Sequence, residues 1–335
     1  MLISSRKNLN FDEIKSFLPV SVASDIESLI PFIESAESEY IEPILGSALY
    51  AYLLTYYTNP LVTGTWIGTN HEKWADLLKK VQRSLINLAY WTGYDLLNVT
   101  MDSTGFHREE SETRKGLYKY QEDSLKSLFR NNGFNGLDKV LAFLESNIEI
   151  FADFKSSSSY TIRKSSLVPD TNTLNSIFFI DNNRLVFLRI QRYIEQVEDF
   201  TIQSVLGGSL YLKVKEEMVK DEPAPEVTAL LPYLKKPVVY LSVAKALGEL
   251  GVNITDRSIF LESQETASGD GLVRKTVPDS VLLQVIRAAE MSGTKYLALL
   301  KSFLLANVTD YPEYSGHSGS VFTRDNAEKR TFWVG

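Results

Sequence analysis

The sequence contains no cysteine and only three histidines among its 335 residues. The lack of cysteine excludes disulfides, thiolate zinc sites, iron–sulfur clusters and a cysteine nucleophile. The histidines, His71, His107 and His317, are far apart along the chain, and no His-Glu-x-x-His pattern occurs. We therefore predict no cofactor, no metal site and no enzymatic activity.

Long hydrophobic runs and an excess of basic residues are also missing. The most apolar stretch, 281–306, is interrupted by Arg287, Glu290, Lys295 and Lys301, so no membrane span is predicted. Asp and Glu number 42 against 35 Lys and Arg, a formal charge of −7 that argues against direct nucleic-acid binding. The first residues lack the apolar core of a secretory leader, so we expect a cytoplasmic protein.

The strongest positive feature is an internal repeat. The stretch 32–50 aligns with the stretch 193–211 without a gap, far beyond chance at average composition. The identical pairs are Ile33/Ile194, Glu34/Glu195, Glu37/Glu198, Ile41/Ile202, Leu45/Leu206, Gly46/Gly207, Leu49/Leu210 and Tyr50/Tyr211. The alignment extends more weakly to the last helix, where 139–144 falls on 295–300. Two tandem copies of one module are predicted.

Each copy has apolar residues at helical spacing in a first helix that ends at the repeated Leu-Gly pair. A short helix and then a long helix follow. After the long helix, 98–107 and 253–261 place β-branched residues on both sides of polar turn residues, which predicts a small hairpin. In the first copy we expect two final helices, 112–130 and 136–150, and in the second one region, 279–306. The predicted fold class is mainly α, a tandem duplication of a helical module with a small β-hairpin in each copy.

Composition shifts divide the chain into four parts. The first copy spans 1–155, a Ser-rich linker follows at 156–167, the second copy spans 168–310, and an extended C-terminal tail covers 311–335.

The repeated acids are the best carboxylate pattern in the chain. Glu34 and Glu37, like Glu195 and Glu198, are three residues apart and would share one face of a helix. A di-metal bundle would need matching Glu-x-x-His motifs, which are absent. A solvated face is one expectation, and ion pairs to Lys or Arg between packed helices are a second.

Gly46 and Gly207 follow the last apolar pair of their helices, where a glycine in the left-handed conformation would end the helix. Tyr50 and Tyr211 come just after this break, and we interpret them as packing anchors.

The predicted tail carries aromatic residues without an apolar stripe of their own. Phe322, Phe332 and Trp333 are therefore predicted to dock onto a partner chain or onto the body of the protein.

The Ile-Glu-x-x-Glu pattern followed by Leu-Gly-x-x-Leu-Tyr, at 33–50 and 194–211, resembles uncharacterised proteins of gut bacteria and their phages and prophages. More remotely, it is similar to the small helical head–tail connector (adaptor) proteins of tailed phages. Those connectors usually carry one module, whereas this chain carries two. The resemblance implies a structural virion component that joins portal and tail, forms a homo-oligomeric ring and acts through protein partners.

Two other classes stay open. A helical binding or scaffold protein could use the groove between its two modules. An enzyme with no recognisable motif is the third alternative, because fold alone does not exclude activity.

Overall fold

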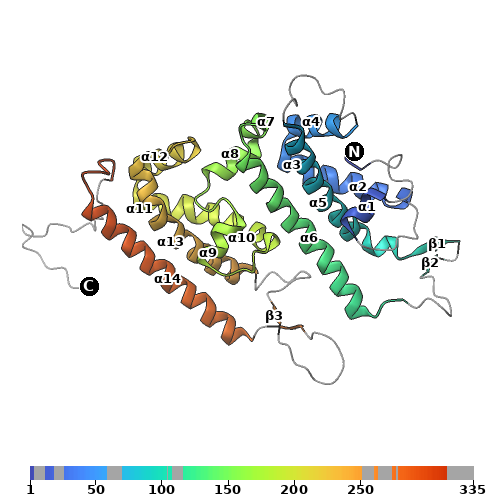
Figure 1. Ribbon diagram of the computed structural model, residues 1–335. Helices are drawn as coiled ribbons and strands as arrows, with labels where there is room; N and C mark the ends of the chain where they lie inside the picture. Colours follow the sequence, from blue (N-terminus) through green and yellow to red (C-terminus); the bar gives the residue numbers. More distant parts are fainter. Residues whose placement is uncertain are drawn as a thin grey trace, which may run out of the picture.

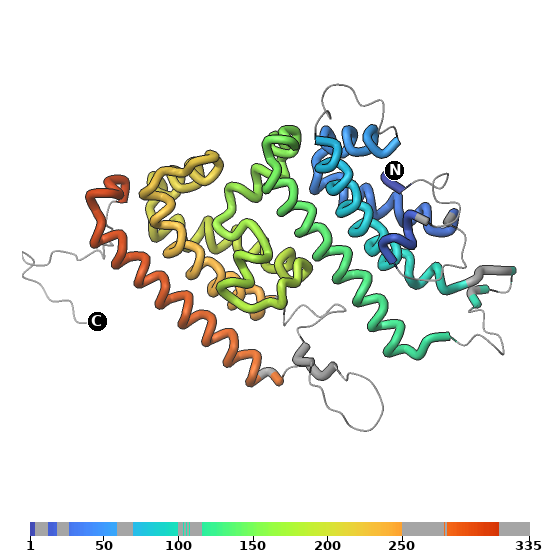
Figure 2. Tube along the Cα trace, in the orientation of Figure 1, coloured from blue at the N-terminus to red at the C-terminus, as the bar shows by residue number. Residues whose placement is uncertain are grey.

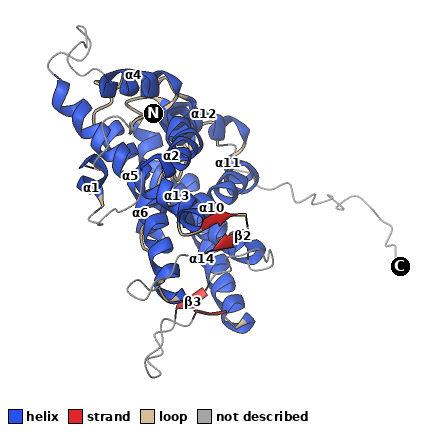
Figure 3. Cartoon of the chain, turned by 90° about the vertical axis from the view of Figure 1, so that its right-hand side faces the viewer, coloured by secondary structure: helices blue, strands red, loops and turns tan. Residues whose placement is uncertain are grey.

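The computed structural model describes residues 1–3, 12–18, 26–58, 70–103, 105–107, 116–250, 260–262, 274–276 and 278–314. Helices make up most of this part of the chain (Figure 1, Figure 3). Its buried apolar residues form two separate cores, one from Leu2 to Tyr160 and the other from Leu167 to Tyr314. We call the segments that build them the first and the second module. The prediction of a mainly helical fold is confirmed.

The first module contains eight of the described α-helices, a 3-10 turn, a π-helical turn and a strand pair. They are α1 (Asp12–Phe17), η2 (Ile26–Ser28), α2 (Ile30–Ala36), η3 (Glu37–Ile41), α3 (Glu42–Leu45), α4 (Ser47–Thr58), α5 (His71–Leu97), β1 (Thr100–Asp102), β2 (Gly105–His107), α6 (Lys119–Ser146), α7 (Ala152–Lys155) and α8 (Ser158–Ser165).

The second module repeats much of this order. Its described elements are α9 (Thr171–Ile177), α10 (Arg184–Gln196), η5 (Val197–Ile202), α11 (Gln203–Leu206), α12 (Gly208–Val219), α13 (Pro225–Leu250), β3 (Phe260–Glu262), β4 (Arg274–Thr276) and α14 (Asp279–Ala306).

A π-helical turn interrupts the same helix in both modules. In each case it begins at or just before the second repeated glutamate, in η3 at Glu37 and in η5 at Val197. The inserted residue of a π-turn shifts the face that the helix presents, which is why such turns are frequent at functional sites. The helical spacing of the apolar residues alone did not reveal this insertion.

Gly46 and Gly207 end these helices with nearly the same backbone, φ 79° and ψ 150° for Gly46 and φ 79° and ψ 154° for Gly207. The predicted left-handed helical cap is wrong in one respect, because ψ is extended. This combination is restricted to glycine. It lets one residue close a helix and open the next: the Gly46 N–H donates to Glu42 O at 2.9 Å, and Tyr50 N–H donates to Gly46 O at 3.0 Å.

The long helices pair as α5 with α6 and as α13 with α14. At the crossing, a Cβ on Gly133 of α6 would lie 2.7 Å from Leu88, and a Cβ on Gly293 of α14 would lie 2.6 Å from Leu241. Glycine therefore permits the same close approach of two helices in both modules.

This equivalence corrects the predicted alignment of the last helix. Both α6 and α14 have 28 residues, and Asn147 and Asn307 end them with the same side-chain hydrogen bond, to Phe143 O and Phe303 O, each at 2.8 Å. Lys139 is therefore equivalent to Leu299, not to Lys295. The predicted register is wrong by about one helical turn, a shift that preserves the apolar stripe.

The first copy also has one final helix, where two were expected. Gly133 and Gly136 lie inside α6. A Cβ on Gly136 would come within 3.0 Å of Ser84 on α5. These glycines serve helix packing, and the prediction of a break between residues 130 and 136 is wrong.

The strands are three residues long and antiparallel. In the first module β1 pairs with β2, with Met101 opposite Phe106. In the second module β3 pairs with β4, with Leu261 opposite Lys275. Residues 253–259 of the second predicted hairpin lie outside the described residues. The partner of β3 comes after it in the chain, whereas the prediction placed it before.

The predicted linker 156–167 is wrong, because most of it is α8. The Ser157 side chain caps this helix by accepting from Tyr160 N–H at 3.2 Å. Tyr160 is buried in the first core, and Leu167 in the second. A serine side chain at a helix N-terminus accepts a hydrogen bond from a backbone N–H of the first turn that has no partner within the helix. The serine run is therefore the start of a helix.

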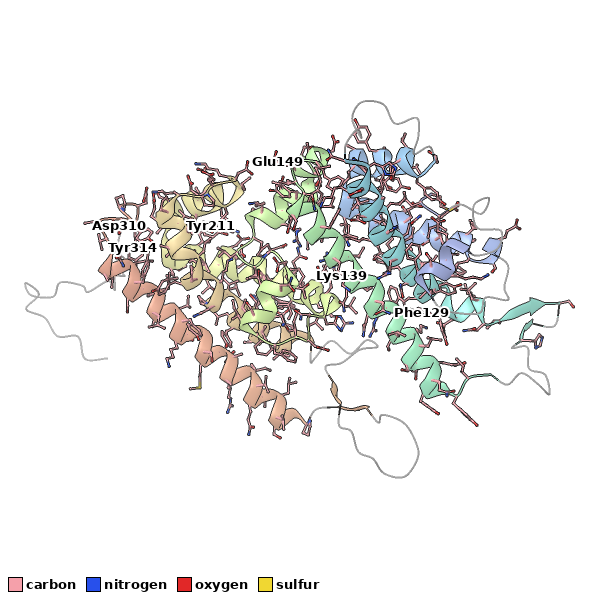
Figure 4. All side chains as sticks on the ribbon, in the orientation of Figure 1. Phe129, Lys139, Glu149, Tyr211, Asp310 and Tyr314 are labelled. Carbon is pink, nitrogen blue, oxygen red and sulfur yellow. The ribbon has the colours of Figure 1, made fainter. Side chains whose placement is uncertain are left out.

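The predicted tail begins too early. Tyr311 and Tyr314 are buried in the second core, where they follow α14 as Phe151 and Phe154 follow α6. The Tyr311 hydroxyl donates to Glu226 O at 2.8 Å. In Figure 4, Tyr314 lies at the same end of the module as Tyr211. Residues 315–335, including Phe322, Phe332 and Trp333, lie outside the described residues.

The two modules repeat along one direction. In Figure 1 and Figure 2, α6 and α14 run along the same diagonal, α6 through the middle of the molecule and α14 at its outer edge. α6 contacts α10, and α8 contacts both α3 of its own module and α12 of the other. α6 and α8 therefore form the first module's side of the junction.

Candidate functional site

The repeated acids separate into two environments. Glu37 and Glu198 are buried, with 4% and 2% of their surface exposed, whereas Glu34 and Glu195 are exposed. The expectation of one shared solvated face is therefore wrong for Glu37 and Glu198. The π-helical turn that contains them directs these two side chains toward the interior.

Glu198 binds the chain where it enters the second module. Its Oε1 accepts from Leu167 N–H at 2.8 Å and from the Ser166 hydroxyl at 3.2 Å. Its Oε2 forms an ion pair with Lys215 of α12, and Lys215 Nζ also donates to Ser165 O at 2.7 Å. One carboxylate thus joins η5, α12 and the end of α8.

Glu37 makes the equivalent contact in the first module. Its Oε1 accepts from Leu2 N–H at 2.7 Å, and the Tyr50 hydroxyl also hydrogen-bonds to this carboxylate. Leu2 and Leu167 are both fully or almost fully buried. In both modules, therefore, a buried glutamate on the π-turn holds the N–H of an apolar residue that inserts into the core.

Burial raises the pKa of both buried glutamates above the ordinary value of 4.5. For Glu198 the neighbouring Lys215 and the hydrogen bonds from Leu167 and Ser166 oppose this rise without cancelling it. A buried carboxylate with fixed partners is suited to positioning the chain.

The repeated tyrosines use different acids. Tyr50 bonds Glu37, whereas the Tyr211 hydroxyl donates to Asp199 Oδ1 at 2.8 Å. Burial and the adjacent carboxylate raise the pKa of both hydroxyls. Lys215 Nζ lies 5.4 Å from the Tyr211 ring, so the tyrosine also borders the Glu198–Lys215 pair. Both tyrosines adjoin the buried acids of their modules.

A cavity of about 720 Å³ lies beside this network, between the two modules. Its walls come from α3, α6 and α8 of the first module and from α10, η5 and α12 of the second. The lining residues used below are Leu141, Arg163, Arg184, Glu195, Glu198 and Lys215. The cavity has a mixed polar and apolar lining, and both modules complete it at the junction.

Three ion pairs surround the cavity. The Arg184 side chain of α10 pairs with Asp138 of α6, and the Arg184 backbone N–H donates to Asn135 Oδ1 at 3.1 Å. Arg163 of α8 pairs with Glu145 of α6 at 2.8 Å, and Glu198–Lys215 is the third pair. Of these three, the Arg184 pair crosses between the modules and fixes α10 against α6. The exposed pair of Lys155 and Asp221, at 2.7 Å, also joins the modules.

Arg184 is buried, with 5% of its surface exposed, and its Nε has no hydrogen-bond partner. Burial lowers the pKa of its guanidinium, and Asp138 opposes that change. A buried cation of this kind is costly without its partner. The junction therefore depends on Asp138.

Within the described ranges, no group of three or more His, Asp or Glu residues is arranged to hold a metal ion. None of the helices in that part of the chain has the length and apolar character needed to cross a membrane. His71 contacts the Tyr56 hydroxyl, with 3.1 Å between Nε2 and the oxygen.

The comparison with protein families gives two matches to one model, described as a family of unknown function (DUF6712). They cover residues 41–164 and 202–322. The chain belongs to the DUF6712 family. The matches begin at Ile41 and Ile202, a pair that the repeat aligns, so the tandem duplication is confirmed. No curated protein and no solved structure matches the chain.

Both DUF6712 matches continue past the last long helix of their module. The first ends at Lys164, inside α8, so the family's own unit includes the helix that we predicted to be a linker. The second ends at Phe322, beyond the described residues.

Sequence reasoning did not find the residues of the junction. Arg163, Arg184 and Lys215 belong to no repeated motif, because their counterparts in the other copy are different. One signal was present: Lys215 follows Tyr211 and Val214 on the apolar side of a short helix, where an unpaired charge would be costly.

Proposed function

We propose that this DUF6712 chain is a structural, non-enzymatic component of a phage or prophage virion. It is of the head–tail connector (adaptor) type and is located first in the host cytoplasm and then in the virion. It acts through protein–protein contacts with portal or tail proteins and with itself. The observation that carries the proposal is the junction, where one module already binds another through helix faces and an ion pair.

The architecture supports an assembly role in a second way. Large apolar side chains remain exposed at the start of α6, with Tyr118 at 71%, Tyr120 at 52% and Leu128 at 52%. Exposed groups of this kind are typical of protein interaction sites. Tyr118 and Tyr120 stack at 5.9 Å between ring centroids, which presents a flat aromatic surface.

Binding to a portal protein tests the proposal. The full chain is mixed with a purified portal protein of a tailed phage, and complex formation is measured by size-exclusion chromatography with light scattering. Co-elution at a fixed stoichiometry is expected. A chain that elutes apart from portal proteins and from tail proteins contradicts the proposal.

Truncation of the C-terminal segment provides a second test of the proposal. Deletion of 321–335 removes Phe322, Phe332 and Trp333 and leaves the second core, which ends at Tyr314, intact. The truncated chain should keep its circular dichroism spectrum and lose partner binding. Loss of the helical signal would contradict a docking role for these residues.

A binding or scaffold protein that uses the groove between its modules is the second candidate, and the junction cavity favours it. A small molecule held there would raise the melting temperature of the purified chain. An ordered metabolite in this cavity would favour this reading or an enzyme over a connector.

A further inference from the structure

The outer face of α14 is the counterpart of the face with which α6 binds the second module. Gly133 and Gly293 place α6 and α14 on their partner helices in the same way, against Leu88 and Leu241. Because the two helices are equal in length and equivalent in packing, the faces that point away from these partners also correspond.

On α6 this outward face is partly covered. Asn135 and Asp138 bind Arg184 of α10, and Glu145 binds Arg163 of α8. These three positions share one stripe of the helix because they are spaced by three and seven residues. The second module and the helix that leads into it rest on this stripe.

On α14 the same stripe has nothing over it in the described part of the chain. Met291, at the position of Asn131, is 74% exposed, and Leu305, at the position of Glu145, is 60% exposed. Lys295 and Ala298, the counterparts of Asn135 and Asp138, are also exposed. Figure 1 shows α14 along the outer edge of the molecule. We call Met291, Lys295, Ala298, Lys301 and Leu305 the α14 outer face.

The first module carries the surface that would meet this face. Leu141 of α6 and Glu195 of α10 line the junction cavity from opposite modules. The counterpart of Leu141 is Lys301, and the counterpart of Glu195 is Glu34; both are exposed. Two positions that line the internal junction from opposite modules therefore carry opposite charges at the two ends of the chain.

We propose that the α14 outer face binds the first module of a second copy of this chain and repeats the internal junction between subunits, with Lys301 of one subunit facing Glu34 of the next. The contact is head-to-tail, so it extends to a closed ring or to a filament. It follows from the duplication and does not depend on a role at a portal.

Sedimentation velocity of the full chain over a concentration series tests this interface. Oligomers larger than a dimer are expected, because each subunit has both surfaces. Lys301→Glu and Glu34→Lys should each weaken association about tenfold, since each places like charges against each other. The double variant Lys301→Glu/Glu34→Lys should restore association. Lys79→Glu, at an exposed lysine of α5, is the matched control and should associate normally.

A chain that stays monomeric at all concentrations overturns the proposal. So do single variants that associate like the parent, or a double variant that remains as weak as the single ones. Met291→Asp provides a second probe of the same face, and its normal association would also overturn the proposal. Circular dichroism checks that each variant is folded. Portal binding by a chain that does not self-associate would refute this interface and leave the connector proposal standing.

Discussion

Arg184 at the start of α10 and Asp138 in the middle of α6 form an ion pair that joins the two modules, and 7% of the arginine side chain is exposed. The arginine and the aspartate come from different modules, and Leu185, next to Arg184 on α10, packs against the first core.

Removing Asp138 should destabilise the protein more than removing a surface acid. Asp138→Ala leaves Arg184 buried without its partner, which costs about 3 kcal/mol. Asp221→Ala is the matched control, because its pair with Lys155 at 2.7 Å is exposed on both sides and contributes about 0–1 kcal/mol. Urea denaturation followed by circular dichroism measures both. Equal losses for the two variants would show that the junction does not depend on the buried pair.

The glycines at the helix crossings should not tolerate a methyl group. Gly133→Ala and Gly293→Ala place a Cβ within 2.7 Å and 2.6 Å of a leucine, and overpacking of this kind costs about 1–3 kcal/mol. Gly248→Ala in α13 is the control, since no atom lies within 4 Å of its Cβ, and this change should stabilise the helix by up to about 1 kcal/mol. Thermal unfolding of the three variants provides the measurement. A stabilised Gly133→Ala would contradict the close helix approach.

Alanine substitutions at Gly207 and Gly208 distinguish the cost of backbone strain from the cost of a packing clash. Neither Cβ would meet another atom within 4 Å, but only Gly207 has a positive φ, at 79°. Gly207→Ala should therefore cost about 1–3 kcal/mol, and Gly208→Ala should be neutral or stabilising. Denaturant midpoints distinguish the two. Equal denaturant midpoints for the two variants would contradict the claim that the connection between the two helices requires the positive φ of Gly207.

The buried glutamates should make stability depend on pH. Because burial raises the pKa of Glu198 above 4.5, the folded state retains a proton that the unfolded state has already released. The contribution to stability is fully present below about pH 4.5 and is lost as pH rises through the raised pKa. Glu198→Gln cannot titrate and should show a shallower loss of stability over this window than the parent.

Glu195→Gln, at the exposed partner of the pair, is the control and should keep the parental slope. The free energy of unfolding is measured by urea titration from about pH 4 to about pH 8. The slope is the readout, because the amide also changes the contacts with Lys215 and Leu167 and so shifts the free energy of unfolding at every pH. Parallel slopes for parent and Glu198→Gln would contradict burial of an ionisable carboxylate.

The repeat was the part of the fold that the sequence predicted best. Pairs such as Glu37/Glu198 and Gly46/Gly207 depend on local backbone geometry, which both copies retain, so they are visible as identities. The π-turns were missed because a single inserted residue leaves the apolar spacing nearly intact. The serine run at 156–159 was misread because serine favours both loops and helix starts.

The junction could not be predicted because it is not repeated. Asp138 and Arg184 are 46 positions apart, and their counterparts in the other copy carry no matching charges, so neither periodicity nor self-comparison brings them together. Their pairing follows from the way α10 packs on α6, which is a tertiary property. Lys301 and Glu34 are equivalent to Leu141 and Glu195, which line the junction cavity from opposite modules.

The most direct test of the assembly role is electron microscopy of the purified full chain, alone and with the portal protein. The account predicts closed rings or head-to-tail strings of the chain alone, and rings seated on the portal in the mixture. A chain seen only as single particles beside undecorated portals would contradict it.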